Sequence, residues 1–401
     1  MKHSGDSDPR PSAFLLAPEA PYPLAGGGPM RTAGLLHYLA RHYDVDLAVF
    51  REPASPDPEA HLPGGLVRRV WVLDLPHHSR AGAARLARNS IRLLRGRPPL
   101  TDRFAGFEGV LNSILGARRY DLGVIDHFWC ASYHAAMAPR ADRVALNVHN
   151  VESVLHARCA AAERGSIAWA HRWFSRCARR LERRWLPRFD RVLAPSQADV
   201  DTLRRIAAGV RAGVYPNTIP WYSPVKRDAV DAIVFSGNME YHPNSAAVRY
   251  FAGEIWPSLR SQWPSLNWLL IGKNPRAVVA YMERDARIRV VGAVDNAVEA
   301  LALAKVAVVP LAAGSGTRVK ILEAWAACIP VVSTTVGAEG LPARDGEHLL
   351  IADDPAAFAA AVSRLLASPE LRQQIGAAGR RLYERQFTWE AGWEHLQKSG
   401  L

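Results

Sequence analysis

Short apolar runs, many of them rich in β-branched residues, alternate along the chain with longer stretches whose apolar residues recur at helical spacing. This alternation predicts parallel sheets covered by helices on both faces. The predicted strands of the first half are Phe14–Pro18, Val45–Phe50, Val67–Leu75, Leu122–Asp126, Val144–His149 and Val192–Ala194. Those of the second half are Ala232–Ser236, Trp268–Ile271, Ile288–Val291, Val306–Pro310, Pro330–Ser333 and Leu349–Ala352. Because the pattern occurs twice, we expect an α/β protein with two doubly wound, Rossmann-like domains.

A proline-rich segment separates the two series of strands. Pro216, Pro220 and Pro224 follow one another closely, which disfavours both helix and central strand. We therefore predict a disordered lead-in, an N-terminal domain, a C-terminal domain and a tail that could pack back on the first domain. Their predicted limits are residues 1–12, 13–222, 223–385 and 386–401.

Composition and charge narrow the choice of partners. The chain has 401 residues, enough for two cores, and a formal net charge of +12 that favours nucleotide diphosphates, anionic lipid surfaces or nucleic acid. It has no apolar run long enough to span a membrane, and its N-terminus lacks the apolar core of a secretory signal. Its four cysteines include no Cys-x-x-Cys pair, which argues against a zinc site and fits reduced thiols in the cytoplasm.

A glycine-punctuated turn, Gly314–Glu323, joins the predicted strand Val306–Pro310 to a predicted helix. Free backbone N–H groups in such a turn bind anions, and Arg318 and Lys320 add positive charge beside it. Glu323, expected in the first turn of the helix, can accept hydrogen bonds from the vicinal hydroxyls of a ribose. The donor-binding candidates in this segment are Ser315, Gly316, Thr317, Ile321 and Leu322. A nucleotide-sugar fits the segment, and a basic loop that only caps a helix fits these residues equally well.

Further glycine turns follow strands elsewhere in the second half. Gly237 and Asn238 come after the strand Ala232–Ser236, and Gly272 comes after Trp268–Ile271. Because the carboxyl ends of parallel strands lie at one edge of a sheet, we expect these turns to join the donor site.

The first predicted strand of the chain leads into three consecutive glycines, Gly26, Gly27 and Gly28. Because such a run lets a ligand approach the backbone closely, we expect a substrate or diphosphate loop at the cleft between the domains, and the alternative is a flexible connection from strand to helix. The run does not match the Gly-x-Gly-x-x-Gly fingerprint, so a nicotinamide cofactor is not expected.

Polar side chains end two other strands of the first half. His149 closes the strand Val144–His149 and is followed by Asn150 and Glu152, while Asp126 and His127 end another strand. A histidine at this edge can bind a sugar hydroxyl or transfer a proton. An isolated histidine is more often structural, but the neighbouring Asn150 and Glu152 favour an acceptor-side polar site.

Arginines form a helical stripe in the first half, with an apolar stripe beside it. The arginines are Arg85, Arg88, Arg92 and Arg95, and the apolar residues are Ala83, Ala87, Ile91 and Leu94. A basic amphipathic helix can lie on an anionic membrane. An ordinary surface helix with a solvated charged face is the favoured alternative, because the apolar stripe contains small residues. Aromatics do not interleave with this charge as in a nucleic-acid-binding module.

Taken in order, these segments resemble the retaining glycosyltransferases of family 4, also called group 1, which have the GT-B fold. The resemblance covers about residues 13–390, is most specific in Pro310–Leu341, and looks closest to members associated with bacterial exopolysaccharide synthesis. The family signature has two glutamates, of which Glu323 matches the second, whereas Ser315 replaces the first. The Arg/Lys pair that many members carry after the turn at Gly237 is also absent, and our hypothesis is that Arg318 and Lys320 replace its charge.

The resemblance implies two domains facing a cleft and transfer of a sugar from a nucleotide diphosphate donor, with retention at the anomeric carbon. The candidate catalytic residues are His149, which the resemblance places near the reacting centre, Glu323, and our own candidates Arg318 and Lys320. The resemblance also implies a glycan or lipid-linked acceptor and neither a cofactor nor a metal. The location would be cytoplasmic, with possible contact at the inner face of the membrane. The alternatives are a nucleotide-sugar epimerase or hydrolase of the same fold and a non-catalytic nucleotide-sugar-binding paralogue.

Overall fold

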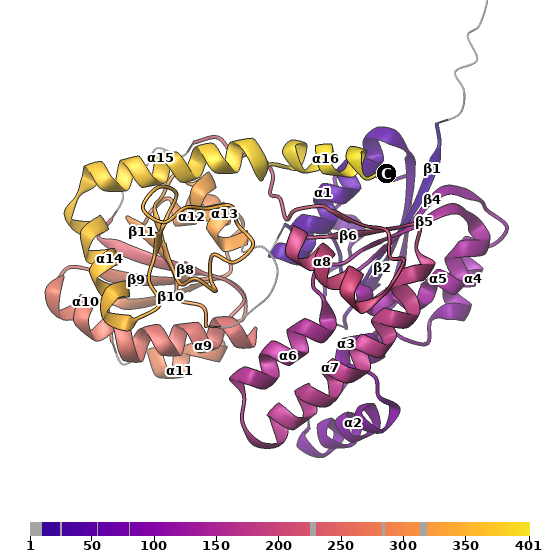
Figure 1. Ribbon diagram of the computed structural model, residues 1–401, viewed down its shortest axis with the longest axis horizontal. Coiled ribbons are helices and arrows are strands. Elements are labelled where there is room, and N and C mark those ends of the chain that lie inside the picture. Colours follow the sequence, from indigo (N-terminus) through magenta and orange to yellow (C-terminus); the bar gives the residue numbers. More distant parts are fainter. Residues whose placement is uncertain are drawn as a thin grey trace, which may run out of the picture. The chain divides into compact units, whose positions relative to one another are not determined.

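The computed structural model describes residues 10–24, 26–53, 55–79, 81–224, 230–282, 285–312 and 319–401. This part of the chain forms two compact units (Figure 1). The first unit contains the described residues up to Leu24, Gly28–Tyr215 and Ser399–Leu401. The second contains Gly26, Gly27 and the described residues of Pro216–Lys398.

The first unit is built on a seven-stranded sheet in which every pair of neighbours is parallel. The strands are β1 (Ser12–Ala17), β2 (Asp44–Arg51), β3 (Arg69–Asp74), β4 (Tyr120–Asp126), β5 (Ala141–Asn147), β6 (Arg191–Ala194) and β7 (Ala212–Val214). Their order is β3-β2-β1-β4-β5-β6-β7, with Ser12 opposite Asp44 and Ala13 opposite Leu122. The strand order therefore reverses between β1 and β4, the position where ligands bind in doubly wound folds.

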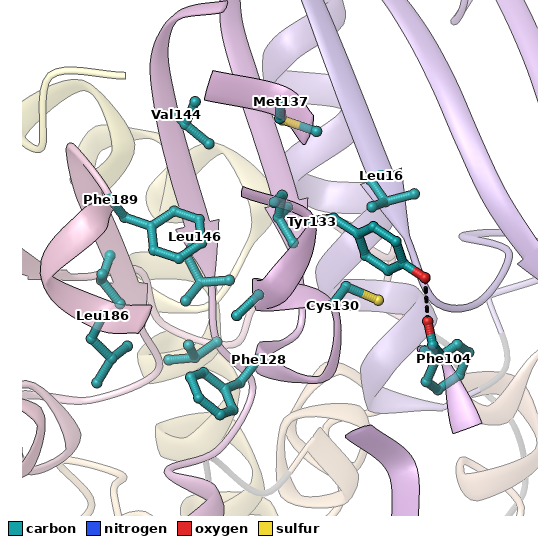
Figure 2. Packing of buried hydrophobic residues seen from close by; sticks show 14 of the residues in the cluster. Leu16, Phe104, Phe128, Cys130, Tyr133, Met137, Val144, Leu146, Leu186 and Phe189 are labelled. Atoms are coloured by element: carbon teal, nitrogen blue, oxygen red, sulfur yellow. Dashed lines mark hydrogen bonds between the residues drawn. The ribbon is translucent and has the colours of Figure 1, made fainter. Parts of the chain in front are cut away.

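Helices flank this sheet and complete its core. They are α1 (Gly27–His42), α2 (Gly82–Arg95), α3 (Pro99–Arg103), α4 (Glu108–Leu115), α5 (His134–Met137), α6 (Glu152–Ala162), α7 (Gly165–Trp185) and α8 (Gln197–Ile206). Short 3-10 turns occupy Glu59–His61, Phe128–Tyr133, Ala138–Arg140 and Leu186–Arg188. Figure 2 shows part of the core, where Leu146 lies among aromatic side chains and the Tyr133 hydroxyl donates to the Phe104 carbonyl oxygen. That hydrogen bond allows a tyrosine to be buried without losing its polar partner.

The second unit has a six-stranded sheet, again parallel throughout. Its strands are β8 (Ala232–Ser236), β9 (Asn267–Ile271), β10 (Ile288–Gly292), β11 (Val306–Val309), β12 (Val331–Ser333) and β13 (Leu350–Ile351), in the order β10-β9-β8-β11-β12-β13. Its helices are α9 (His242–Tyr250), α10 (Trp256–Gln262), α11 (Arg276–Met282), α12 (Ala297–Leu301), α13 (Val319–Ala326), α14 (Pro355–Ala367), α15 (Pro369–Gln386) and α16 (Trp389–Lys398). A π-helical turn, Phe251–Ile255, joins α9 to α10.

The predicted fold class, two doubly wound α/β domains, is confirmed. Each predicted strand appears in the sheets within a few residues of its expected position, and β7 is an additional strand of three residues. Among the described residues, none of the helices has both the length and the apolar character that a bilayer crossing requires.

The two units divide at Tyr215, earlier than the predicted limit at residue 222. Backbone hydrogen bonds explain this position, because Ile219 N donates to Phe387 O at 2.9 Å and Trp389 N donates to Ile219 O at 3.1 Å. The proline-rich segment thus pairs with the region after α15. Most of the predicted tail, including α16, belongs to the second unit, and only Ser399–Leu401 group with the first.

Candidate active site

In the first unit, the carboxyl ends of β4 and β5 meet the first turns of α1 in a buried polar cluster. Asp126, the last residue of β4, is 0% exposed and accepts three hydrogen bonds. Thr32 Oγ1 donates to its Oδ2 at 2.7 Å, Asn147 Nδ2 donates to its Oδ1 at 2.6 Å, and His149 Nε2 lies 2.9 Å from the same Oδ1. The cluster therefore fixes the His149 ring through the carboxylate of Asp126.

Arg31 holds the other side of Asn147. Its Nε and Nη2 donate to Asn147 Oδ1 at 3.0 and 2.7 Å, and its Nη1 donates to the carbonyl oxygen of Tyr215 at 2.6 Å. The guanidinium lies 4.4 Å from the centre of the Tyr215 ring. These contacts satisfy a cation whose residue is only 1% exposed, although burial still lowers the Arg31 pKa to about 10.

His127 stacks against His149. The two ring centroids are 3.4 Å apart, and the other face of the stack continues through Trp129, whose centroid is 4.0 Å from that of His127. His127 has φ of 63°, an uncommon value for a residue with a side chain. Both of its ring nitrogens are buried and have no hydrogen-bond partner among the described residues. Such a group indicates a position where a ligand or water completes the bonding.

The protonation states follow from burial and nearby charge. Burial lowers the pKa of His149 and lowers that of His127 well below its ordinary value, so both rings are neutral at neutral pH. Burial also opposes ionisation of Asp126, but its hydrogen bonds with His149 and Thr32 favour the carboxylate and lower its pKa. With Asp126 ionised, His149 Nε2 carries the proton and its Nδ1 can accept a hydrogen bond.

Asp126, His127 and His149 are also close enough to share a metal ion, since one ligand atom from each lies within 4.8 Å of the others. Two observations disfavour that use. The oxygens of Asp126 already accept three hydrogen bonds, and the Arg31 cation lies on the far side of Asn147. An added cation would have to break these bonds and oppose this charge.

Two buried carboxyl groups lie beside the cluster. Glu152, in the first turn of α6, accepts a hydrogen bond from Trp129 Nε1 at 3.0 Å. Burial, with help from the nearby Glu182, raises the Glu152 pKa to about 8. Glu182 accepts from the backbone N–H of Ser153 at 3.0 Å, and Asn150 is half-buried just before α6. Glu152 therefore carries a proton at neutral pH and keeps the Trp129 ring in place.

The three glycines expected in a connecting loop have different roles. Gly26 has φ of 107°, whereas Gly27 and Gly28 form the start of α1. A Cβ on Gly28 would collide with the carboxylate of Glu19, so this position excludes a side chain unless Glu19 moves. The space beside Gly28 is thus filled by the Glu19 side chain.

In the second unit, the equivalent edge of the sheet carries a lysine and a buried glutamate. Lys320 Nζ donates to Asn244 Oδ1 at 2.7 Å and lies 4.3 Å from the centre of the Phe235 ring. Ser236 Oγ lies 3.4 Å from Glu323 Oε2, and Glu323 is 7% exposed. Burial raises the Glu323 pKa to about 7, opposed by Lys320 and Ser236. A carboxyl group with this pKa ionises readily when hydrogen-bond donors arrive.

The glycine turns after β8 and β9 pack directly against each other. Gly272 has φ of 142°, and a Cβ there would collide with the carbonyl oxygen of Gly237. A Cβ on Gly237, which has φ of 151°, would lie 2.6 Å from Asn244 Nδ2 and 3.1 Å from Lys320 Nζ. Asn238 extends this arrangement, because its carbonyl oxygen accepts from Asn244 Nδ2 at 2.9 Å. Close packing therefore requires glycine at both turns.

Within each unit, the structure brings most of the predicted site residues together. Ser315, Gly316, Thr317 and Arg318 lie outside the described residues. The side chains of Ile321 and Leu322 are fully buried, so these residues could contact a donor only through their backbone atoms. Glu323 lies in the second turn of α13 rather than the first, because that helix already begins at Val319. His149 lies just beyond β5, which ends at Asn147.

Four site residues were not predicted. Arg31 and Thr32 lie in the helix α1, and nothing in the local pattern distinguishes them from exposed polar residues. Asn147 lay inside the predicted strand Val144–His149, where a polar residue in an apolar run was a usable signal. Asn244 follows the turn at Gly237 and lies on α9, but its contact with Lys320 is long-range.

Comparisons with known proteins agree with this geometry. A family model described as "Glycosyl transferase 4-like domain" matches residues 26–218, and one described as "Glycosyl transferases group 1" matches residues 231–368. An uncharacterized 44.6 kDa protein in the cps region of Klebsiella pneumoniae is 22% identical over 362 residues, covering 86% of this chain and 88% of that protein.

Solved structures share the fold over nearly the whole length. Sucrose-phosphate synthase from Thermosynechococcus elongatus matches with a TM-score of 0.72 at 18% identity, covering 96% of this chain and 98% of that one. HepE of Anabaena, in a complex with UDP-glucose, matches with a TM-score of 0.66 at 14% identity, covering 97% and 100%. The two family models together span most of both units, and the chain accordingly belongs to the group 1 glycosyltransferases, with the two Rossmann-like domains of the GT-B fold.

Proposed function

We propose that the protein transfers a sugar from a nucleotide diphosphate-sugar to an acceptor, with retention of configuration at the anomeric carbon. The observation that carries this proposal is the arrangement in the second unit, where Lys320 reaches the glycine turn at Gly237 and Glu323 lies buried beside β8. A cation at a tight glycine turn suits a diphosphate, and a shielded carboxyl group suits the paired hydroxyls of a ribose.

In the reaction, the bond between the anomeric carbon and the donor phosphate oxygen breaks, an acceptor hydroxyl oxygen bonds to that carbon, and the hydroxyl proton passes to the leaving diphosphate. The nucleoside diphosphate leaves with added negative charge, and Lys320 stabilises that charge together with backbone N–H groups of the turn. Arg318 is proposed to add a second cation, as its position in the sequence suggests.

His149 is proposed to contact the transferred sugar. Asp126 holds its Nε2–H, so the neutral ring presents Nδ1 as an acceptor for a sugar hydroxyl. The acceptor-side set includes Asn150, Glu152 and the glycines that precede and begin α1.

We propose that the reaction needs neither a cofactor nor a metal ion at the diphosphate. The Lys320 cation supports this, because it supplies charge that a divalent ion would otherwise provide. Activity should accordingly persist in EDTA, and a complete loss that magnesium restores would contradict this part of the proposal.

The acceptor is proposed to be a glycan or a lipid-linked glycan in exopolysaccharide or other cell-surface synthesis. The relative encoded in a capsule region supports this role. The corresponding location is the cytoplasm, with contact at the inner face of the cytoplasmic membrane.

The decisive experiment is product analysis with a panel of nucleotide-sugars, starting with UDP-glucose, in the presence and absence of a membrane-extracted acceptor. Glycosylated product with the donor's anomeric configuration, measured by proton NMR, is the expected result. Inverted product would refute retention. Free sugar or an isomerised nucleotide-sugar would indicate a hydrolase or an epimerase, and tight donor binding without turnover would indicate a non-catalytic paralogue.

A further inference from the structure

Helix α2 turns its apolar side chains toward solvent. Leu86 is 70% exposed and Leu94 is 88% exposed, and Ile91 is also exposed on the same side of the helix. The other side is held to the protein by an ion pair in which Arg92 Nε lies 3.0 Å from Asp102 Oδ2. Large apolar side chains of α2 are thus left in contact with solvent, whereas Arg92 is held against the protein.

The first half of α7 extends this apolar area. Trp169, which is 55% exposed, lies nearly parallel to Trp173, with ring centroids 6.4 Å apart. Trp173 Nε1 donates to Leu93 O in α2 at 3.0 Å, so the exposed indole and the leucines lie at the same end of the first unit, where Figure 1 shows α2 beside α7. Ile167, two residues before Trp169, is also exposed but lies on a different side of α7. We call Leu86, Ile91, Leu94 and Trp169 the α2–α7 surface.

Arginines outnumber acids around the α2–α7 surface, where Asp102 is paired with Arg92 and Glu163 precedes α7. Residues 81–101 contain no aspartate or glutamate, and Arg95 and Arg97 are exposed near Leu94. Arg172 and Arg176 are exposed on α7. Exposed apolar side chains and an indole flanked by arginines form a combination that suits an anionic lipid surface.

We propose that the α2–α7 surface binds the face of an anionic bilayer. The leucines and Trp169 enter the boundary between headgroups and acyl chains, and the arginines contact lipid phosphates while their stems cover apolar area. The inference deepens the proposed function, on which it rests for a lipid-linked acceptor, by naming the surface that brings the enzyme to that acceptor.

Co-sedimentation of the full chain with lipid vesicles tests the proposal. The probes are phosphatidylcholine vesicles with and without about a quarter phosphatidylglycerol, at low and high salt. Binding to the anionic vesicles should be at least about tenfold stronger and should weaken with salt. The double variant L86S/L94S should lose about tenfold in binding, and the double variant R95Q/R97Q should lose most of the salt-sensitive part.

Matched controls keep the outcome clear. Val110→Ser changes an exposed apolar residue on α4, and Arg119→Gln changes an exposed arginine, and both should bind vesicles like the parent. Absence of vesicle binding by the parent, or equal binding by L86S/L94S and Val110→Ser, would overturn the proposal. A dimer in light scattering that L86S/L94S dissociates, without vesicle binding, would overturn it in favour of self-association.

Sugar transfer to a water-soluble acceptor without vesicles separates the two proposals. All four variants should keep the parent's rate in that assay, because none of the changed residues lies in the polar clusters of the two units. If transfer fails for every chain while vesicle binding behaves as expected, the proposed function fails and the lipid-binding surface stands.

Discussion

The imidazole ring of His127 lies on that of His149 with their centroids 3.4 Å apart, yet only His149 has a hydrogen-bond partner among the described residues. One ring is thus fixed by Asp126 and the other by stacking alone. Two neutral rings can stack this closely because burial keeps the pKa of each below its ordinary value. A substrate hydroxyl that enters the cluster would complete the bonding of the buried His127 nitrogens.

Replacing His127 with phenylalanine should separate stability from activity. The stack survives, and two buried unsatisfied nitrogens disappear, so the free energy of unfolding should rise by about 1 kcal/mol. The ratio kcat/KM should fall by about tenfold, because the substrate loses a hydrogen bond. Chemical denaturation and steady-state kinetics measure the two effects. Unchanged kinetics in a stabilised variant would show that His127 serves only as a platform.

Donor affinity should depend on pH through Glu323. With a pKa of about 7 in the folded chain, Glu323 becomes ionised in an increasing fraction of molecules between about pH 6 and pH 8. Only the ionised group accepts hydrogen bonds from both ribose hydroxyls, so donor affinity should rise over that range. Glu323→Gln should bind the donor about tenfold more weakly at the upper pH and show a flat profile. Calorimetric titration with UDP-glucose or another accepted donor measures both.

The same pKa sets the sign of the stability change. The Glu323 pKa is about 7 in the folded chain and 4.5 in the unfolded chain, so between these pH values the folded chain keeps a proton that the unfolded chain has lost. The contribution of Glu323 to the free energy of unfolding therefore falls as the pH rises from 4.5 to about 7. Glu254→Gln, an exposed site in the same unit, is the control and should alter neither profile. A parent protein with pH-independent donor affinity would contradict the ribose assignment.

Asp126→Asn should weaken both the fold and the chemistry of the first unit. The change replaces a carboxylate that accepts three hydrogen bonds, so the free energy of unfolding should fall by about 2 kcal/mol or more. Since the folded state lowers the Asp126 pKa, the parent should lose this stabilisation below about pH 4, and the variant should lose less there. Thermal unfolding of the parent and of Asp126→Asn, measured at a series of pH values, tests this difference.

The matched control for Asp126 is Asp142→Asn. Asp142 is exposed and pairs with Arg119 at 3.0 Å, an ion pair of the kind that contributes little. Equal destabilisation of the two variants would mean that the hydrogen bonds to Asp126 contribute no more to stability than an exposed ion pair does. Affinity for the nucleoside diphosphate alone should be unchanged in both, since the residues proposed to bind the diphosphate and the ribose lie in the other unit.

Gly272→Ala should destabilise the second unit by more than about 2 kcal/mol, because its new Cβ collides with the Gly237 carbonyl at a backbone angle that alanine disfavours. Gly253→Ala is the control, since a Cβ there meets nothing within 4 Å and its φ is not positive. That variant should be neutral or slightly more stable. Similar unfolding midpoints for the two would remove the close-packing argument.

The sequence was sufficient to predict the strands because both faces of each sheet are covered. A strand such as Phe14–Pro18 then reads as an uninterrupted apolar run, and the observed β1 is buried on both sides. Strand β7 has only three residues, Ala212–Val214, and gives no such run. Asp126 and His149 were found because polar residues at strand ends are conspicuous against that background.

Residues that are buried by parts of the chain distant in sequence could not be predicted in the same way. Arg31 reads as an exposed helical residue, yet the fold closes over it with Asn147 and the Tyr215 carbonyl. For α2, the sequence showed that arginines and apolar residues lie on different sides of the helix. The side that packs against the protein is determined by Asp102 of α3 and Trp173 of α7, which the sequence of α2 does not reveal.

The mutual contact of the turns at Gly237 and Gly272 has a consequence for engineering. A side chain at Gly272 would displace the turn at Gly237, and one at Gly237 would displace Asn244, so libraries aimed at altered sugar preference should leave both glycines unchanged. Diversity belongs instead at neighbours such as Asn238, which is exposed enough to vary. If a selection returned variants with substitutions at Gly237 or Gly272, the backbone of these turns would have changed conformation, and any change in sugar preference would result from that.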